Sequence, residues 1–305
     1  MSSTASRRPS ERVTTRRFSV VVVIASALLV AGCSAPATPT ATRPQPTATS
    51  TPEVVTSLAA VSPASGSVTG GTVLTLTGTG LADVTDVTIG GVAAADVTVT
   101  DDTTVTAVAP AAVDFQPADA EIVVSAGDAA VPQSTPLTHS YAVVTGLDAQ
   151  MQYALAHWDD YNEAEWGDLN SVGGDCANFV SQTLIQRGWE QNATWFNRDA
   201  AADWSPAWGY APAMNNWFAS ESGPALTRLT LDQRDQVKVG DIGMFDWNDN
   251  DTPDHVMLVS SVTLVDGVTE IAFVSHNLDG AYRDLDTVIT EEHPGGNAWF
   301  WSVPA

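Results

Sequence analysis

Cysteine is scarce in this 305-residue sequence, which contains only Cys33 and Cys176. Basic residues are scarce as well, because 12 Lys and Arg stand against 36 Asp and Glu. Five of these bases and one of these acids precede Cys33, so the remainder carries a net charge near −28. A surface of that sign repels phosphate backbones and anionic headgroups, which excludes nucleic acid as a partner.

The first 33 residues combine a basic start with an apolar run at 18–31. This run is too short and wrongly flanked for an ordinary spanning helix, and it is typical of a secretory signal. It ends in Leu29-Val30-Ala31-Gly32-Cys33, which resembles the lipobox of bacterial lipoproteins, whose cysteine is acylated. We therefore expect a signal peptide at 1–33 and a lipid on Cys33 that anchors the protein to the extracytoplasmic face of the cell membrane.

Residues 34–53 are mainly Pro, Thr, Ala and Ser and lack large apolar side chains. Such a segment cannot bury a core, so we expect an extended tether. If Cys33 carries a lipid, Cys176 is left as a lone thiol in an oxidising compartment. A lone thiol there is either buried and inert or reactive.

Residues 54–144 predict an all-β domain. Short segments rich in β-branched residues alternate in polarity between Gly, Asp and Pro turns, at 72–77, 84–89, 97–99, 104–108 and 121–125. This pattern indicates a β-sandwich, here without a disulfide. The segment 61–72 and Thr77-Gly78-Thr79-Gly80-Leu81 resemble the IPT/TIG family of Ig-like domains. The resemblance implies a spacer or a module that contacts protein or glycan.

Residues 147–305 differ in character, because all ten tryptophans lie here and helical spacing begins. An amphipathic helix is predicted first, with apolar positions at i, i+3, i+4 and i+7, namely Met151, Ala154, Leu155, Trp158 and Tyr161. A second helix is predicted after residue 174, followed by strands at 241–247, 255–263, 269–275 and 299–303. Helices followed by antiparallel strands predict an α+β domain.

The run Gly-Gly-Asp-Cys-Ala-Asn-Phe-Val-Ser-Gln at 173–182 marks the start of the second helix. Asp175 is a preferred N-cap residue, which puts Cys176 at the first helical position. Free N–H groups and the helix dipole favour an anion there, so we expect a lowered pKa for the Cys176 thiol. A structural cysteine that packs beside Val180 is the alternative.

A thiolate nucleophile needs a base, and the base needs a third polar group to hold it. His255 opens one predicted strand, while His276 and Asn277 end the next. Adjacent antiparallel strands can place His255 beside one of these two, and the period of two lets only one of them face it. His276 is the preferred orienting residue, with Asn277 as the alternative.

These segments together resemble the bacterial putative amidase domain family, which is related to the papain-like CHAP and NlpC hydrolases. The resemblance covers roughly residues 150–303 and rests on the run at 173–182, Gly240-Asp241, Asp254-His255-Val256 and Ser275-His276-Asn277. It implies a papain-like hydrolase domain at 147–305, with Cys176 as nucleophile, His255 as base and His276 or Asn277 as orienting group. The implied activity is hydrolysis of peptide or amide bonds in peptidoglycan, without a cofactor.

An acidic loop precedes His255, in which Asp246, Asn248 and Asn250 alternate as the first ligands of a calcium loop do. The glycine and glutamate that complete such a loop are missing, so a solvated turn is favoured over a calcium site. The sequence thus predicts a membrane-anchored cysteine amide hydrolase of the cell envelope. A non-catalytic adhesin or ligand-binding lipoprotein is the alternative.

Overall fold

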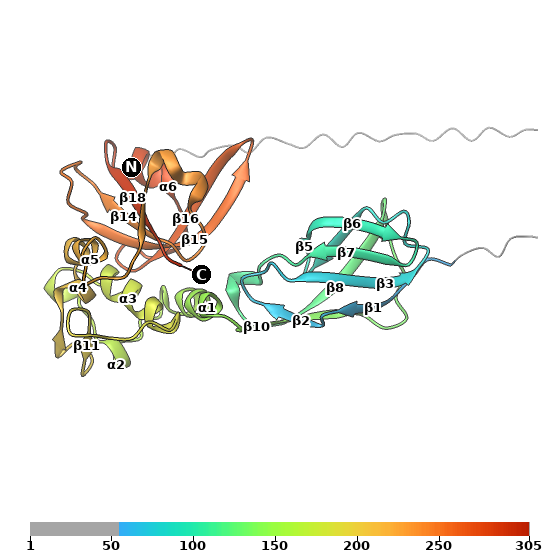
Figure 1. The fold of residues 1–305 in the computed structure, drawn as a ribbon, viewed down its shortest axis with the longest axis horizontal. Helices are drawn as coiled ribbons and strands as arrows, with labels where there is room; N and C mark the ends of the chain where they lie inside the picture. Colours follow the sequence, from blue (N-terminus) through green and yellow to red (C-terminus); the bar gives the residue numbers. More distant parts are fainter. Residues whose placement is uncertain (1–54, 305) are drawn as a thin grey trace, which may run out of the picture. The chain divides into compact units, whose positions relative to one another are not determined.

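The computed structural model describes residues 55–304, so the expected signal peptide, the lipid site at Cys33 and nearly all of the tether lie outside the described residues. Within this range, no helix is long and apolar enough to cross a membrane. A β-rich part comes first along the chain and a mixed α/β part follows it (Figure 1).

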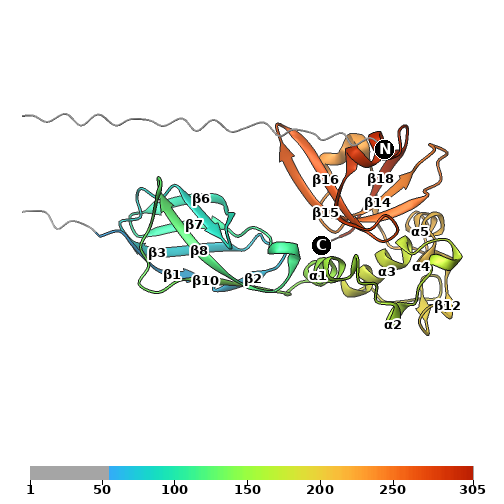
Figure 2. The same cartoon turned by 180° about the vertical axis from the view of Figure 1, so that it is seen from behind.

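The first part is a β-sandwich of two sheets (Figure 2). One sheet has the order β1-β3-β7-β6, and the other has the order β2-β10-β8-β4-β5 with β9 beside β8. The strands are β1 (Ser57–Ser62), β2 (Ser65–Ser67), β3 (Val73–Thr79), β4 (Asp86–Ile89), β5 (Val92–Ala93), β6 (Ala95–Asp101), β7 (Thr104–Val108), β8 (Asp119–Ala126), β9 (Ala129–Ala130) and β10 (Thr138–Ala142), with a 3-10 turn η1 (Val113–Phe115) before β8.

Alternation of side chains explains this sandwich. Leu74 and Leu76 of β3 are buried, as are Val105 of β7 and Ile122 of β8, while their neighbours are more exposed. Every second residue of a strand points to the same face, so these positions form one apolar layer between the sheets. The five strands predicted from sequence are confirmed, as β3, β4, β6, β7 and β8.

The second part contains a six-stranded sheet in the order β13-β18-β14-β15-β16-β17, and all its neighbours are antiparallel. The strands are β13 (Thr227–Thr230), β14 (Ile242–Asp246), β15 (His255–Val265), β16 (Val268–Ser275), β17 (Gly280–Asp284) and β18 (Asn297–Ser302), and a small pair is formed by β11 (Asn197–Arg198) and β12 (Asp203–Trp204). The helices are α1 (Gly146–His157), α2 (Glu163–Trp166), α3 (Cys176–Gln186), α4 (Pro206–Gly209), α5 (Ala211–Phe218) and α6 (Leu285–Thr287), with the shorter turns η2 (Asn170–Val172), η3 (Leu231–Gln236) and η4 (Val288–Glu292).

Helix α1 is shorter than its sequence pattern predicts. A capping box between Thr145 and Asp148 starts it, and it ends at His157. Two acidic residues follow at 159 and 160, and negative charge is unfavourable at the C-terminal end of the helix dipole. Tyr161 therefore lies beyond the helix, where it becomes part of the candidate site.

The six-stranded sheet buries side chains on both of its faces. Val256 and Leu258 of β15 belong to the same core as helix α3, whereas Met257 and Val259 belong to a second core with Leu285 of α6. Figure 1 shows α3 and α6 on opposite sides of this sheet. The sheet thus separates two environments, and which face a residue of β15 occupies decides what it can contact.

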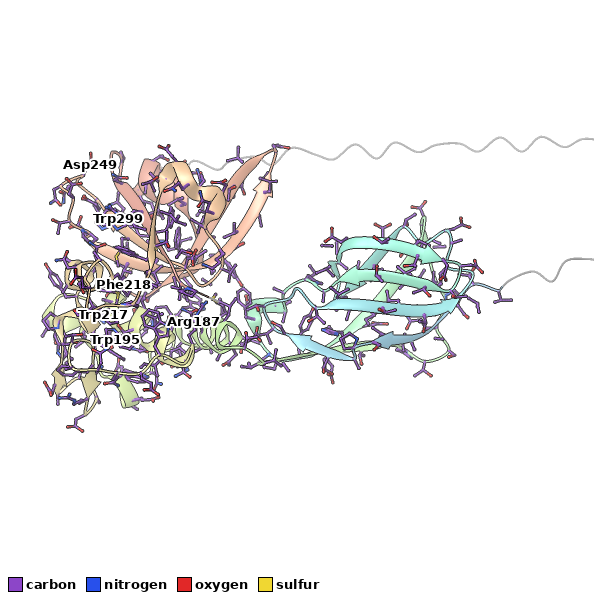
Figure 3. The ribbon with its side chains drawn as sticks, in the orientation of Figure 1. Arg187, Trp195, Trp217, Phe218, Asp249 and Trp299 are labelled. Atoms are coloured by element: carbon purple, nitrogen blue, oxygen red, sulfur yellow. The ribbon has the colours of Figure 1, made fainter. Side chains whose placement is uncertain are left out.

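Tryptophans fix α3 from the side away from the sheet. The indole N–H of Trp195 donates to Ser181 Oγ at 3.0 Å, and that of Trp208 donates to Asn178 Oδ1 at 2.7 Å. Trp217 stacks on Trp195 with centroids 5.3 Å apart, and these two rings gather near α5 in Figure 3. Buried hydrogen bonds of this kind hold a helix in one register, so the polar residues of the 173–182 run position α3.

Candidate active site

Cys176 is the first residue of α3, as the sequence predicts. Its side chain is buried. The cap differs from the prediction. Asp175 does not cap the helix with its side chain, because its Oδ1 accepts hydrogen bonds from the N–H of Leu169 at 3.0 Å and from Asn178 Nδ2 at 2.8 Å. Asn277 supplies the cap instead, since its Oδ1 accepts the N–H of Cys176 at 3.1 Å and also the N–H of Asp175.

The electrostatics of the thiol also differ from the prediction. Burial raises the pKa of the Cys176 thiol to about 11, and the negative charge of Asp175 acts in the same direction. Hydrogen bonds from the backbone N–H groups of Val256, Ala177 and Cys176 itself oppose this rise in pKa. The expected lowering of the pKa is therefore wrong for this geometry, because removing the thiolate from water outweighs the helix start.

His255 begins β15 and lies opposite Phe245 of β14. Alternation along the strand puts the His255 ring on the face of Met257, while Val256 faces α3. Its ring stacks on Trp247 with centroids 5.9 Å apart. Burial, together with the positive charges of Arg283 and His293, lowers the pKa of His255 to about 3, so the imidazole is neutral.

The start of β15 lies near the Cys176 sulfur, but it is the backbone of this strand and not the His255 ring that faces the thiol. The backbone N–H of Val256, one residue after His255, is near enough to the sulfur of Cys176 to oppose the rise in its pKa. His255 Nε2 is buried and has no hydrogen-bond partner within residues 55–304. The structure therefore brings Cys176 to the start of β15, but no hydrogen bond joins Sγ to His255 Nε2 among the described residues, because the His255 ring lies on the other face of the sheet.

His276, the predicted orienting residue, has other partners in the structure. Its Nδ1 lies 2.6 Å from Asp175 Oδ2, and its Nε2 lies 2.7 Å from the carbonyl oxygen of His157. The ring is fully buried and stacks between Tyr161 and Phe179, with centroids 3.4 Å and 4.0 Å away. Both ring nitrogens are occupied, so His276 does not hold His255.

Asn277, the alternative orienting residue, is bonded to α3 rather than to His255. Besides capping the helix, it donates through Nδ2 to Asn170 Oδ1. The last β15–β16 pair at this end is Leu258 with Val274, and the chain then turns through Asn277 and Leu278 at φ of 55° and 89°. The period of two therefore no longer applies beyond Ser275, which is why the pairing predicted across the two strands is not seen.

The calcium candidates have local roles. Asp246 Oδ1 accepts the N–H of Asn248 at 3.3 Å, and Asn250 Oδ1 accepts the N–H of Thr252 at 2.9 Å. Asp246 Oδ2 is buried without a hydrogen-bond partner in the part of the chain that the structure describes. Among the described residues, no group of three or more His, Cys, Asp or Glu side chains could hold a metal ion.

Solved structures similar to this chain match it weakly. The extracellular region of plexin A4 is 24% identical over 28% of this chain and 8% of its own, with a TM-score of 0.25. A putative phosphatase from Bacteroides thetaiotaomicron is 27% identical over 28% of this chain and 18% of its own, with a TM-score of 0.22. A glucan-utilization protein of Bacteroides ovatus, solved with a mixed-linkage heptasaccharide, is 8% identical over 81% and 52%, with a TM-score of 0.25. The chain spans about half or less of each protein, and these TM-scores support no functional argument.

Family models identify both parts of the chain, although no curated protein matches it. An IPT/TIG domain model matches residues 57–141, which is the β-sandwich. A second model, described as a putative amidase domain, matches residues 146–301, just over half of the chain. This match includes α3 with Cys176, the start of β15 with His255, and the segment after β16 with His276 and Asn277. The chain therefore belongs to the putative amidase domain family, preceded by an IPT/TIG domain.

Proposed function

We propose that the protein is a cysteine amide hydrolase of the cell envelope, with a papain-like catalytic domain at 147–305. One observation carries the proposal: in a domain of the amidase family, Cys176 is the first residue of α3, and the backbone N–H of Val256 at the start of β15 acts on its thiol. The residue before Val256 is His255, whose Nε2 is buried and has no hydrogen-bond partner among the described residues. A candidate base is therefore adjacent in sequence to the residue whose N–H acts on the nucleophile.

The proposed reaction begins with a neutral thiol on Cys176 and a neutral imidazole on His255. The first residue of β15 reorients so that the His255 ring reaches the face of Cys176 and accepts the proton of the thiol, and the thiolate attacks the carbonyl carbon of an amide. The C–N bond then breaks as His255 returns the proton to the leaving nitrogen, which leaves a thioester on Cys176. Water hydrolyses this thioester and restores the thiol. Backbone N–H groups around the sulfur, including those of Val256 and Ala177, stabilise the oxyanion.

Peptidoglycan is the proposed substrate class. A lipid on Cys33 would hold the domain at the extracytoplasmic face of the membrane, and the segment at 34–53 would let it reach outward as a tether. Peptide and amide bonds of the cell wall lie within reach of an enzyme anchored in this way. The IPT/TIG domain would serve as the spacer or as a contact to protein or glycan.

The test is hydrolysis of defined peptidoglycan fragments by the full chain, with products identified by mass spectrometry. Cys33→Ala is the matched control for Cys176→Ala, because it removes the other thiol and leaves the proposed nucleophile. We expect cleavage by the Cys33→Ala protein, a trapped acyl adduct on Cys176 after acid quenching, and no cleavage by Cys176→Ala. Equal cleavage by both variants would overturn the assignment of Cys176.

A second candidate function is ligand binding without catalysis. It is favoured by the burial of Cys176 and by its raised pKa of about 11, since an inert structural cysteine has these properties. In that case the fragments bind to the folded chain without being cleaved, and Cys176→Ala leaves their affinity unchanged.

A further inference from the structure

His276 is bonded at both ring nitrogens to groups that accept hydrogen bonds. Nε2 faces the carbonyl oxygen of His157 at 2.7 Å, and a carbonyl cannot donate, so Nε2 carries a hydrogen. Nδ1 faces Asp175 Oδ2 at 2.6 Å. A flipped ring would place carbon atoms at these short distances from both oxygens, so the orientation of the ring follows from its contacts.

Asp175 is placed to remain a carboxylate in this contact. Its Oδ1 already accepts two N–H donors, from Leu169 at 3.0 Å and from Asn178 at 2.8 Å, and its side chain is almost fully buried. Hydrogen bonds to an ionised acceptor are stronger than those to a neutral one, so the two donors on Oδ1 favour the charged form of the carboxyl group. The proton between the two side chains then resides on Nδ1.

The two aromatic rings that stack on His276 favour the positively charged form of its imidazole. Tyr161 stacks on one face at 3.4 Å with the planes 4° apart, and Phe179 stacks on the other at 4.0 Å with 19° between the planes. The negative π faces of two aromatic rings attract a positive charge, most strongly where water is absent.

We infer that His276 is a buried imidazolium that neutralises Asp175 beneath the proposed nucleophile, and that it acts as a positioning residue for Cys176 and not for His255. The negative charge of Asp175 disfavours the Cys176 thiolate. A positive partner 2.6 Å from Asp175 offsets that charge and holds the first residue before α3 in place. The positive charge of His276 is inferred from its hydrogen-bond geometry alone. Its effect on turnover rests on the proposed function.

Other ionisable groups near His276 do not replace Asp175. Tyr161 remains protonated because burial and the contact of its hydroxyl with Asp279, at 2.6 Å, raise its pKa. His157 contributes only its backbone carbonyl, since its own Nδ1 bonds to the carbonyl oxygen of Asp160 at 2.9 Å. Asp279 contacts Tyr161 and not His276, which makes it a matched control.

The first test is nitrogen NMR of the full chain with labelled histidine, in which the His276 signal is identified by its loss in His276→Gln. We expect both ring nitrogens of His276 to carry a hydrogen in the folded chain at pH 7. Asp279→Asn should leave the signal unchanged, and Asp175→Asn should convert it to a neutral ring. A neutral His276 at pH 7 in the unsubstituted chain overturns the inference, whether or not the protein hydrolyses anything.

The second test measures the rate at which Cys176 is alkylated in the Cys33→Ala background, where Cys176 is the only cysteine. Removing the imidazolium by His276→Gln leaves Asp175 uncompensated, so alkylation of Cys176 at a fixed pH near 8 should slow by about tenfold, which corresponds to one pKa unit. A purely structural role for His276 would loosen α3 and speed alkylation, which contradicts the inference. If His276→Gln does not fold, substitution of each of the other four histidines identifies the His276 signal by elimination, and the NMR experiment on the unsubstituted chain decides.

Discussion

The side-chain oxygen of Asn277 accepts a hydrogen bond from the backbone N–H of Cys176 at 3.1 Å, across 101 residues of sequence. The same oxygen accepts the N–H of Asp175, so two of the unpaired donors at the start of α3 are satisfied by one remote side chain. The cap of the nucleophile helix is therefore a tertiary contact, formed only when the segment after β16 is in place.

Asn277→Ala should lower the free energy of unfolding by about 1 kcal/mol, because it leaves a helix start without its cap. Urea unfolding followed by tryptophan fluorescence measures this, since every tryptophan lies between residues 158 and 301. Asn170→Ala is the control, because it removes only the partner of Asn277 Nδ2 and leaves the cap intact. Equal losses in the two variants would show that the cap contributes nothing of its own.

Local pattern was enough to predict most strands and the start of α3, because apolar alternation and the run at 173–182 act over a few residues. It was not enough to predict the partners of His276. Those depend on Tyr161, which lies past the end of α1, and on the turn at Asn277 and Leu278, where strand pairing has stopped. Asp175 was interpreted as a cap because aspartate suits that position, and only the fold shows that its carboxylate is used elsewhere.

Burial is the second reason why the predicted chemistry of Cys176 and His255 differs from what the structure shows. A helix start and a nearby histidine indicate a reactive thiolate, but sequence does not show how much water reaches the sulfur. In the structure Cys176 and His255 are both withdrawn from solvent, and burial shifts the two pKa values in opposite directions, each toward its neutral form.

Acid should destabilise the domain through His255. Its pKa in the folded chain is lowered to about 3 from an ordinary value of 6.5, so the unfolded chain binds a proton that the folded chain does not. The stabilisation is present above about pH 6.5 and is lost as the pH falls toward about 3. Tryptophan-monitored unfolding between pH 7 and pH 4 should show a smaller loss in His255→Gln than in the unsubstituted chain.

His139→Gln is the control for this experiment. Burial also lowers the pKa of His139, but this residue lies in β10 of the sandwich, which contains no tryptophan. Its substitution should leave the tryptophan-monitored slope unchanged. If His255→Gln loses as much stability between pH 7 and pH 4 as the unsubstituted chain, another group in the domain takes up the proton on unfolding.

Cys33→Ala should release the protein from the membrane, because the sequence predicts a lipid at this residue. Fractionation of cells that express either variant measures this, and Cys176→Ala should remain in the membrane fraction. Retention of Cys33→Ala in the membrane fraction would place the anchor at another residue.

Alkylation of Cys176 reports directly on its environment when Cys33→Ala leaves it as the only thiol. With a pKa near 11 in the folded chain against about 8.5 for a free thiol, the thiolate fraction at pH 7 is lower by more than 100-fold. Iodoacetamide should therefore react slowly with the folded protein, faster as the pH rises toward 11, and fastest after unfolding. Rapid reaction of the folded protein at pH 6 would show that the sulfur is not buried as the structure has it.

The same measurement, paired with hydrolysis, separates the two candidate functions. If slow alkylation is accompanied by cleavage of peptidoglycan fragments, the resting site is closed and the substrate triggers the reorientation of His255 toward Cys176. Fragments that are cleaved should then also change the alkylation rate, because they occupy or open the space at the sulfur. If slow alkylation is accompanied by no cleavage, and fragments leave the rate unchanged, Cys176 is a core residue. The amidase-family domain then serves for binding, and the free nitrogen of His255 is a consequence of burial without a catalytic role.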